Sequence, residues 1–180
     1  MPETLESIAF SIVRRLRDAG FTALYAGGCV RDVLLGLVPH DYDIATDARP
    51  EQARKLFPHT YAVGAHFGVV VVHEGGHDFQ VATFRSDHAY VDGRRPEGVT
   101  FSTPRMDAER RDFTMNGLFF DPIKREIIDY VEGRRDLKAR LDHLSSQLLN
   151  LSIKLDRLLD TGESKPAIRR AKKPGSSSRA

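Results

Sequence analysis

The chain has 180 residues, 41% hydrophobic and 29% charged, with a formal net charge of +2 at pH 7. This composition is that of a globular protein with one ordinary domain and an appendage, and it excludes a wholly disordered chain. The single cysteine, Cys29, excludes an intrachain disulfide and a metal site built from several cysteines. No apolar run has membrane-spanning length and the N-terminus does not resemble a signal peptide, so we expect a cytoplasmic protein with no membrane partner.

The first half of the chain predicts helices alternating with strands. Apolar residues at helical spacing mark the first helix, and Pro50 is a favourable start for the third. In chain order the patterns predict a helix over 3–19, a strand over 21–26, a helix over 30–37, a strand over 41–45 and a helix over 50–57.

Glycine-rich turns organise the middle of the chain. A strand over 69–73 and its partner over 79–84 are joined by Gly75-Gly76, a typical hairpin turn. The polar, glycine- and proline-rich stretch 86–104 is predicted to be a long loop, and such loops are often functional.

The C-terminal part changes character after a helix or turn that opens at 110–117 and a short strand over 127–131. Leucines then recur at alternating steps of three and four residues, which is the stripe of a helical seam. The last twenty residues are rich in Lys, Arg, Ser, Pro and Gly and are predicted to be disordered. The stripe consists of Leu141, Leu144, Leu148, Leu151, Leu155 and Leu158.

Asp41-Tyr42-Asp43 carries the clearest chemistry. Alternation along a strand places the two carboxylates on one face, where they repel each other and call for a cation. Hard oxygen ligands suit Mg²⁺, which completes its shell with waters and phosphates. Upstream, Gly27-Gly28 lets the backbone approach a polyanion and Arg31 supplies a forked donor for phosphate. The segment therefore predicts a site for a metal and a triphosphate, and the alternative interpretation is a solvated turn.

Four ordered blocks resemble the catalytic head of class II tRNA nucleotidyltransferases (CCA-adding enzymes) and bacterial poly(A) polymerases, in the polymerase-β nucleotidyltransferase superfamily. The resemblance covers about residues 5–140. It implies an α+β fold, in which a small mixed β-sheet is backed by helices and the site lies on one exposed sheet face. The blocks are GGCVRDVLLGLVPHDYDIAT (27–46), QVATFRSD (80–87), DGRRPEGVTF (92–101) and ERRDFTMNGLFFDP (109–122).

The resemblance also implies residue roles. Asp41 and Asp43 would ligate two Mg²⁺ ions for in-line displacement at an α-phosphate. The glycine turn and the RRDFT block would bind the nucleotide and its triphosphate, although Asp32 could instead buttress Arg31 and Asp112 could cap a helix. The candidate triphosphate residues are Gly27, Gly28, Arg31, Asp32, Arg110, Arg111, Asp112 and Asn116, with Arg94 and Arg95 as further loop contacts.

Two departures from the family pattern stand out. Many relatives carry a carboxylate on the third strand where this chain has Gln80, so either two aspartates suffice or Asp78, on the same strand face, compensates. After Gly133-Arg134-Arg135-Asp136-Leu137 the resemblance ends, and the ED-x-x-R motif that selects CTP and ATP in full-length relatives does not occur. The residues that would transfer the nucleotide are present, and those that would select the base are missing.

Three hypotheses follow. The first is a template-independent RNA nucleotidyltransferase that uses CTP and ATP on an RNA 3′-end, with tRNA CCA addition favoured over polyadenylation. The second is a nucleotide- or RNA-binding head without useful turnover. The third is an interaction protein that forms a homo-oligomer through the leucine-rich helix, whose alternative role is to pack on the head. We predict a head over 1–136, the leucine-rich helix over 137–160 and a disordered basic tail over 161–180, which either attracts RNA phosphates or only aids solubility.

Overall fold

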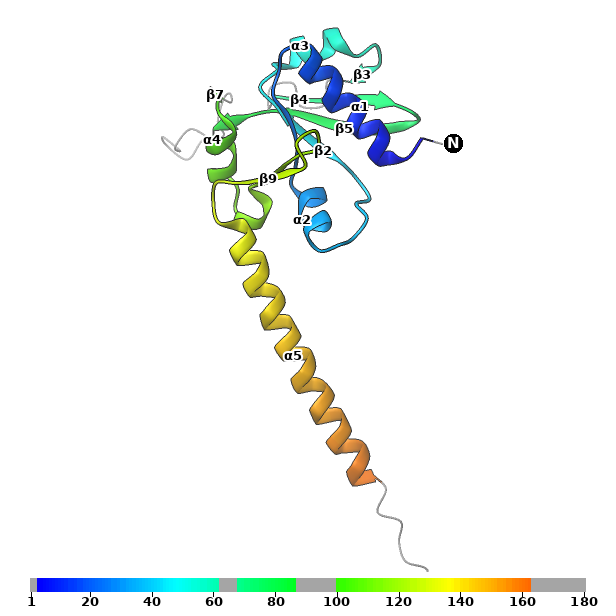
Figure 1. Ribbon diagram of the computed structural model, residues 1–180, viewed down its shortest axis with the longest axis vertical. Helices are drawn as coiled ribbons and strands as arrows, with labels where there is room; N and C mark the ends of the chain where they lie inside the picture. Colours follow the sequence, from blue (N-terminus) through cyan, green and yellow to red (C-terminus); the bar gives the residue numbers. More distant parts are fainter. Residues whose placement is uncertain (1–2, 62–67, 87–99, 163–180) are drawn as a thin grey trace, which may run out of the picture. The chain divides into compact units, whose positions relative to one another are not determined.

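The computed structural model describes residues 3–61, 68–86 and 100–162 (Figure 1). Contacts divide the chain into two compact units, Met1–Ala139 and Arg140–Ala180. The helices are α1 (Leu5–Asp18), α2 (Gly28–Leu34), α3 (Pro50–Leu56), α4 (Pro104–Glu109), the 3₁₀ turn η2 (Thr114–Asn116) and α5 (Gly133–Gly162). The strands are β1 (Ala23–Ala26), β2 (Asp43–Thr46), β3 (Thr60–Tyr61), β4 (Val69–Glu74), β5 (His77–Thr83), β6 (Arg85–Ser86), β7 (Thr100–Phe101), β8 (Leu118–Asp121) and β9 (Glu126–Asp129).

The first unit is built on a seven-stranded sheet with the order β3-β4-β5-β2-β1-β8-β9. Strands β2 and β5 pair in parallel, and the other neighbours pair antiparallel. The sheet is therefore mixed, as the sequence predicts. Strands β6 and β7 form a separate two-stranded ribbon beside the sheet.

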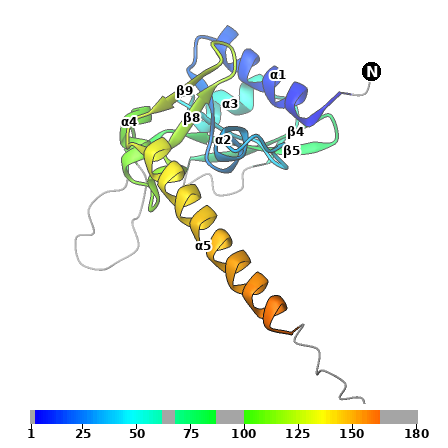
Figure 2. The same cartoon turned by 60° about the horizontal axis from the view of Figure 1, so that its bottom comes forward.

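The two faces of the sheet are covered differently. On one face, α1, α2 and α3 pack against alternate strand residues such as Tyr25, Ile44 and Val81, which form the larger hydrophobic cluster. Figures 1 and 2 show α1 and α3 together near the β4–β5 end of the sheet. On the other face a smaller cluster joins Leu24, Ala26, Ala45 and Phe119 to Ala108 of α4. The part of this second face around Asp43 is left for polar side chains.

Helix α1 shows why the sequence folds this way. Thr4 caps it by accepting a hydrogen bond from the Ser7 N–H at 3.1 Å. Its apolar residues at helical spacing, Ile8, Ile12, Val13 and Leu16, are buried against the sheet. The chain leaves the helix at Gly20, whose φ of +89° is rarely adopted by other residues.

Most predicted elements are confirmed, with shifted ends. The helices predicted over 3–19, 30–37 and 50–57 are α1, α2 and α3, and the Gly75-Gly76 hairpin joins β4 and β5 with both glycines at positive φ. Strand β2 begins at Asp43, so the prediction that Asp41 belongs to the strand is wrong.

Other differences lie around the second half of the head. Strand β8 (Leu118–Asp121) and helix α4 (Pro104–Glu109) were not predicted. The helix or turn expected to open at 110–117 is the 3₁₀ turn η2 (Thr114–Asn116). Residues 100–101 of the predicted loop form β7. The rest of that loop, over 87–99, lies outside the described residues.

The leucine stripe lies in one continuous helix, α5 (Gly133–Gly162). Its first turn is held by Asp129, whose carboxylate accepts hydrogen bonds from the backbone N–H groups of Val131, Gly133 and Arg134 at 3.0–3.1 Å. Burial alone would raise the pKa of Asp129, but these donors lower it further than burial raises it. Among the described residues no helix is long and apolar enough to span a membrane. The basic tail over 163–180 lies outside the described residues.

Candidate functional site

Asp43 opens β2 on the sheet face opposite the large helix-covered cluster. It pairs in register with Ala26 of β1, which pairs with Phe119 of β8, so these three residues form one row across the sheet. Burial and the negative charge of Asp41 raise the pKa of Asp43, and Arg111 partly opposes that rise. The two aspartates therefore interact electrostatically, although Asp41 lies before the strand and is exposed.

Gly27 makes the sharp turn from β1 into α2. Its φ of +70° and ψ of −128° belong to a region that residues with a Cβ rarely adopt. A Cβ at Gly27 would lie 3.7 Å from both Arg111 Nη1 and Asp43 Oδ2. The glycine thus brings the turn between an arginine and a carboxylate of the candidate site.

A cavity of about 470 Å³ lies beside this turn. It brings together the glycine turn and the RRDFT block, which are more than eighty residues apart in the sequence. Its lining residues are Gly27, Gly28, Arg110, Arg111, Asp112 and Asn116, six of the eight triphosphate candidates.

The other two candidates come from α2. Arg31 Nη1 lies 3.5 Å from Asn116 Oδ1, and Arg31 Nε lies 3.7 Å from Asp32 Oδ1. The second contact is the buttressing arrangement considered for Asp32. Asp112 is exposed and accepts a hydrogen bond from the Phe113 N–H at 3.0 Å, so it shapes the turn into η2.

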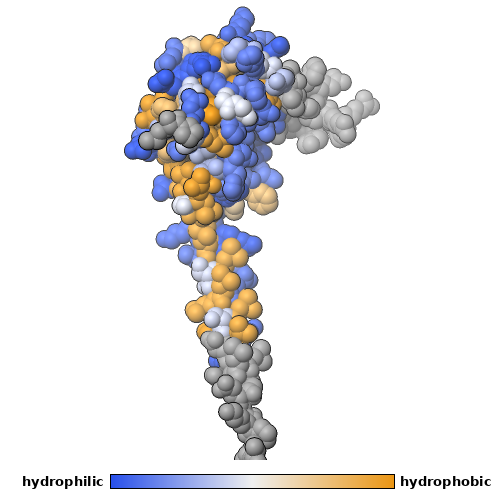
Figure 3. All heavy atoms as spheres, turned by 90° about the vertical axis from the view of Figure 1, so that its right-hand side faces the viewer, coloured by the Kyte–Doolittle hydropathy of each residue, from blue (hydrophilic) through white to orange (hydrophobic). Residues whose placement is uncertain are grey.

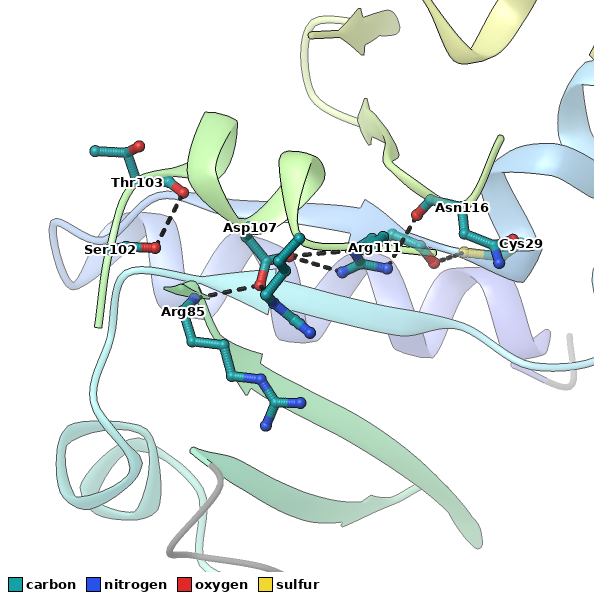
Figure 4. A network of polar contacts seen from close by, with 9 residues as sticks. Cys29, Arg85, Ser102, Thr103, Asp107, Arg111 and Asn116 are labelled. Carbon is teal, nitrogen blue, oxygen red and sulfur yellow. Dashed lines mark hydrogen bonds and ion pairs between the residues drawn. The ribbon is translucent and has the colours of Figure 1, made fainter. Parts of the chain in front are cut away.

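Asp107 is the residue that sequence reasoning missed. It is 2% exposed, and its Oδ1 accepts from Arg110 Nε at 2.9 Å while its Oδ2 accepts from Arg111 Nη2 at 2.8 Å (Figure 4). The backbone N–H of Arg85 also donates to Oδ1, at 3.2 Å. The missed signal was an acid three and four residues before a pair of arginines, the spacing at which side chains meet on a helix.

Arg111 is fixed from three sides. Asp107 holds one edge of the guanidinium, Nη1 donates to the Asn116 carbonyl at 3.0 Å, and the guanidinium lies 5.5 Å from the centre of the Phe119 ring. Figure 4 shows Arg111 between Asp107 and Asn116. A cation held in this way beside Asp43 is already oriented for an anionic ligand.

Strand β5, the third strand of the family pattern, carries Gln80 on the same face as Asp43. Ile44 pairs with Val81 in the parallel β2–β5 ladder, so the preceding register step aligns Asp43 with Gln80. Asp78 lies two residues earlier on the same face, and its Oδ1 lies 2.7 Å from His73 Nδ1. Asp78 is thus paired with His73 near the β4–β5 turn. Gln80, which aligns with Asp43, is therefore the better candidate for a β5 side chain beside Asp41 and Asp43.

The remaining sequence candidates are quickly placed. Cys29 is buried, burial raises the pKa of its thiol to about 12, and Sγ donates to the Ala26 carbonyl at 3.2 Å, so it is a packed residue and no thiolate nucleophile. Arg94 and Arg95 lie outside the described residues. Within the described ranges, no group of three or more His, Cys, Asp or Glu side chains is placed to hold a metal ion.

The sequence profile of the poly A polymerase head domain matches residues 23–141, about two thirds of the chain. The chain belongs to the poly A polymerase head domain family. This confirms the family predicted from the four sequence blocks, and the mixed sheet with helices behind it confirms the predicted fold.

Named relatives of the head domain family point the same way. The CCA-adding enzyme of Streptococcus mutans is 45% identical over 134 residues, which are 74% of this chain and 33% of that protein. The CCA-adding enzyme of Staphylococcus aureus is 40% identical over 142 residues, which are 78% of this chain and 35% of that protein. The chain therefore spans about a third of the length of these relatives.

Solved structures also match. The Bacillus stearothermophilus CCA-adding enzyme in complex with CTP has a TM-score of 0.66 and 38% identity over 76% of this chain and 32% of the other. A tRNA nucleotidyltransferase complexed with a primer tRNA and an incoming ATP analog has a TM-score of 0.54 and 28% identity over 71% of this chain and 36% of the other. These comparisons do not test the roles of individual side chains, which stay proposals.

Proposed function

We propose that this head domain transfers a nucleotidyl group from CTP or ATP to an RNA 3′-hydroxyl, with a tRNA end as the acceptor. The observation that carries the proposal is the placement of fixed arginines beside two neighbouring carboxylates. It is supported by the similarity to a CCA-adding enzyme in complex with CTP and to a tRNA nucleotidyltransferase complexed with a primer tRNA and an ATP analog. Because the chain spans only part of its relatives, the activity is proposed from the site itself.

The arginines provide the anion-binding half of the site. Arg110 and Arg111 line the cavity, and their side chains are 20% and 19% exposed, so they are largely shielded from water. A guanidinium in such surroundings binds phosphate oxygens more strongly than one in bulk water, and it offers paired donors. Arg31 reaches the same region through Asn116. Together these groups suit the triphosphate of a nucleotide.

The carboxylates fit a divalent metal. The pKa of Asp43 is raised by burial and by the negative charge of Asp41, which means that its ionised form lacks enough positive charge nearby. Oxygen ligands of this kind match Mg²⁺, and Gln80 could add only a neutral carbonyl oxygen. We propose that Asp41 and Asp43 hold two Mg²⁺ ions. When bound, these ions would supply the positive charge that favours a deprotonated hydroxyl and a departing pyrophosphate.

The chain's own residues would then orient the reactants. Arg111, fixed by Asp107 and by the Asn116 carbonyl, would hold a phosphate next to Asp43 without needing to reorganise. The Gly27 turn leaves open the path between them, because no side chain projects from it. The result would be a triphosphate placed with its α-phosphorus near the carboxylates, where the RNA hydroxyl can approach in line.

Two alternatives share this site. A poly(A) polymerase-type adenylyltransferase would use the same carboxylates and arginines with ATP alone. A head that binds nucleotide or RNA without useful turnover would keep the same cavity.

The deciding experiment is nucleotide incorporation with Mg²⁺, using labelled ATP and CTP separately. The acceptors are tRNA lacking its CCA end and an unstructured RNA. Asp41→Ala/Asp43→Ala should abolish incorporation, and Asp18→Asn/Glu51→Gln, which removes two exposed acids elsewhere, should retain it. Addition of C and A to tRNA would support the main proposal, and ATP use on both RNAs would support the polyadenylation alternative.

Absence of incorporation, together with Mg·ATP binding that Arg111→Gln weakens, would support the binding-only head. Incorporation that both aspartate substitutions leave unchanged would refute the site itself.

We also propose that α5 associates with a second copy of the chain. The stripe leucines from Leu141 to Leu155 are 41–67% exposed, and Figure 3 shows apolar side chains gathered along the helix. A helix of this length gains most of its stability from packing its apolar face. Of the positions flanking the stripe between Leu141 and Leu155, Ser145, Gln147 and Ser152 are neutral, so two in-register copies would avoid like-charge contacts there.

Light scattering after size exclusion tests this association. Leu148→Lys in the stripe should shift the mass toward the monomer, and Asn150→Lys, one step off the stripe, should not. A monomer for the unaltered chain at concentrations far above the micromolar range would refute it.

A further inference from the structure

A second cavity, of about 610 Å³, lies on the opposite face of the sheet from Asp43. It is formed where α1, α2 and β1 meet the β8–β9 connection. Its volume lies within the range of small-molecule sites. The lining residues that matter here are Glu6, Phe10, Tyr25, Tyr42, Phe120 and Arg125.

Aromatic rings form its inner wall. The rings of Tyr25 and Tyr42 are 5.0 Å apart between centroids and tilted by 60°, and those of Tyr25 and Phe120 are 6.1 Å apart. Phe10, on α1, is 36% exposed and adds a further ring to the lining. Such a wall favours a planar aromatic or otherwise apolar group.

The Tyr25 hydroxyl has no hydrogen-bond partner among the residues that the structure describes. Tyr25 is only 2% exposed, and its hydroxyl oxygen forms no hydrogen bond within the described part of the chain. Buried polar groups in native proteins are nearly always paired, and an exception points to a water or a ligand. Burial raises the pKa of Tyr25 above its ordinary value, so its phenol stays neutral.

Two opposite charges line the same cavity. Glu6 and Arg125 are both exposed, and no ion pair or hydrogen bond of either side chain is recorded among the described residues. In the described part of the chain no salt bridge within 4.0 Å joins them, so both can contact a ligand. The cavity therefore offers an anion and a cation in addition to its aromatic wall.

We propose that this cavity binds a small zwitterionic molecule with an aromatic ring, of the class of the aromatic amino acids. The ring lies against Tyr25, Tyr42 and Phe120, the ammonium group faces Glu6, and the carboxylate faces Arg125. A ring N–H donates a hydrogen bond to the Tyr25 hydroxyl oxygen or reaches it through a water.

The position of the cavity connects it to the candidate site on the other face. Tyr42 is the residue between Asp41 and Asp43, and Tyr25 precedes Gly27 by two residues. Phe120 follows Phe119, whose ring lies under the Arg111 guanidinium. A ligand that fixes these side chains also fixes the backbone that carries the carboxylates and the glycine turn, so it changes the affinity for Mg·ATP, and Mg·ATP changes its affinity by the same factor.

Calorimetric titration of the full chain without nucleotide tests the binding. The probes are L-tryptophan, tryptamine, which lacks the carboxylate, and indole-3-propionate, which lacks the ammonium group. We expect L-tryptophan to bind about 10-fold more tightly than either analogue, because each lost charge pair removes roughly one such factor. Equal binding of all three would overturn the zwitterionic class, and no binding would overturn the site.

Matched substitutions locate the binding. Tyr25→Phe removes only the hydroxyl and Glu6→Gln only the charge, and each should weaken L-tryptophan binding about 10-fold while the chain stays folded by circular dichroism. Tyr61→Phe, at an exposed tyrosine elsewhere, and Glu51→Gln, at an exposed acid on α3, should leave it unchanged. Equal losses in the controls, or none in the cavity variants, would overturn the assignment.

A second titration tests the coupling. Mg·ATP affinity is measured without L-tryptophan and at the lowest L-tryptophan concentration that saturates the unaltered chain. We expect it to change several-fold in the unaltered chain and less in Tyr25→Phe, whose cavity is only partly filled at that concentration. An unchanged affinity would refute the connection between the faces and leave the binding result standing. Binding in this cavity is read without any catalytic turnover, so it does not depend on the nucleotidyl-transfer proposal.

Discussion

Asp107→Asn tests whether one buried carboxylate organises the anion-binding half of the site. The substitution keeps the side-chain shape and removes its charge, leaving the guanidinia of Arg110 and Arg111, which are only 20% and 19% exposed, without their shared anion. Removing one partner of a buried ion pair costs about 3–5 kcal/mol. Because both arginines keep some contact with water, we expect the lower end, about 3 kcal/mol of unfolding free energy.

That loss should lower the melting temperature by roughly 10 °C for a domain of this size. Arg111 would keep its bond to the Asn116 carbonyl, but the amide at position 107 offers one neutral acceptor oxygen in place of two charged ones that serve Arg110 and Arg111. We therefore also expect Mg·ATP to bind about 10-fold more weakly, a change of about 1.4 kcal/mol. Thermal denaturation and equilibrium nucleotide binding measure the two effects.

The matched control is Glu109→Gln on the same helix. Glu109 lies 3.7 Å from Arg105, and both side chains are more than half exposed, so its removal should change stability by less than about 0.5 kcal/mol. If Asp107→Asn melts and binds nucleotide like Glu109→Gln, the reasoning about the buried carboxylate is refuted.

Three further predictions concern carboxylates. Without metal, Asp43→Asn should raise the melting temperature at pH 7, because the raised pKa of Asp43 means that its ionised form destabilises the fold. The gain should shrink as the pH falls toward 4, where the unaltered carboxyl becomes protonated. A gain that does not change with pH would contradict this origin. The same variant should lose on the order of 100-fold in nucleotide incorporation, and unreduced turnover would remove Asp43 from the reaction. Burial alone would raise the pKa of Asp121, but hydrogen bonds from the Lys124 N–H and from Arg17 lower it by more than burial raises it. Asp121→Asn should therefore reduce the unfolding free energy by about 2–3 kcal/mol in chemical denaturation at pH 7, and by progressively less as acid protonates the unaltered carboxylate. A pH-independent loss would show that the charge is not responsible.

The sequence predicted the elements whose patterns are local. The helical spacing of apolar residues defined α1, and the Gly75-Gly76 pair defined the β4–β5 hairpin, because both signals lie within a few neighbouring residues. Strand β8 escaped prediction although it is mostly buried and lies between Gly117 and Pro122, since four residues carry little periodic pattern. Helix α4 was hidden in a polar stretch, and its start is set by Thr103 accepting a hydrogen bond from the Met106 N–H.

The sequence alone determined the family and its candidate residues, because Asp41, Asp43 and the RRDFT block are recognisable at fixed local spacing. Only the tertiary structure decided which of them meet. It placed Arg111 beside Asp43 through sheet pairing between segments far apart in the chain, and it buried Asp107 beneath both arginines. It also packed Tyr42, on the opposite face, against Tyr25. Contacts between distant segments depend on register and layer packing, which no short sequence pattern contains.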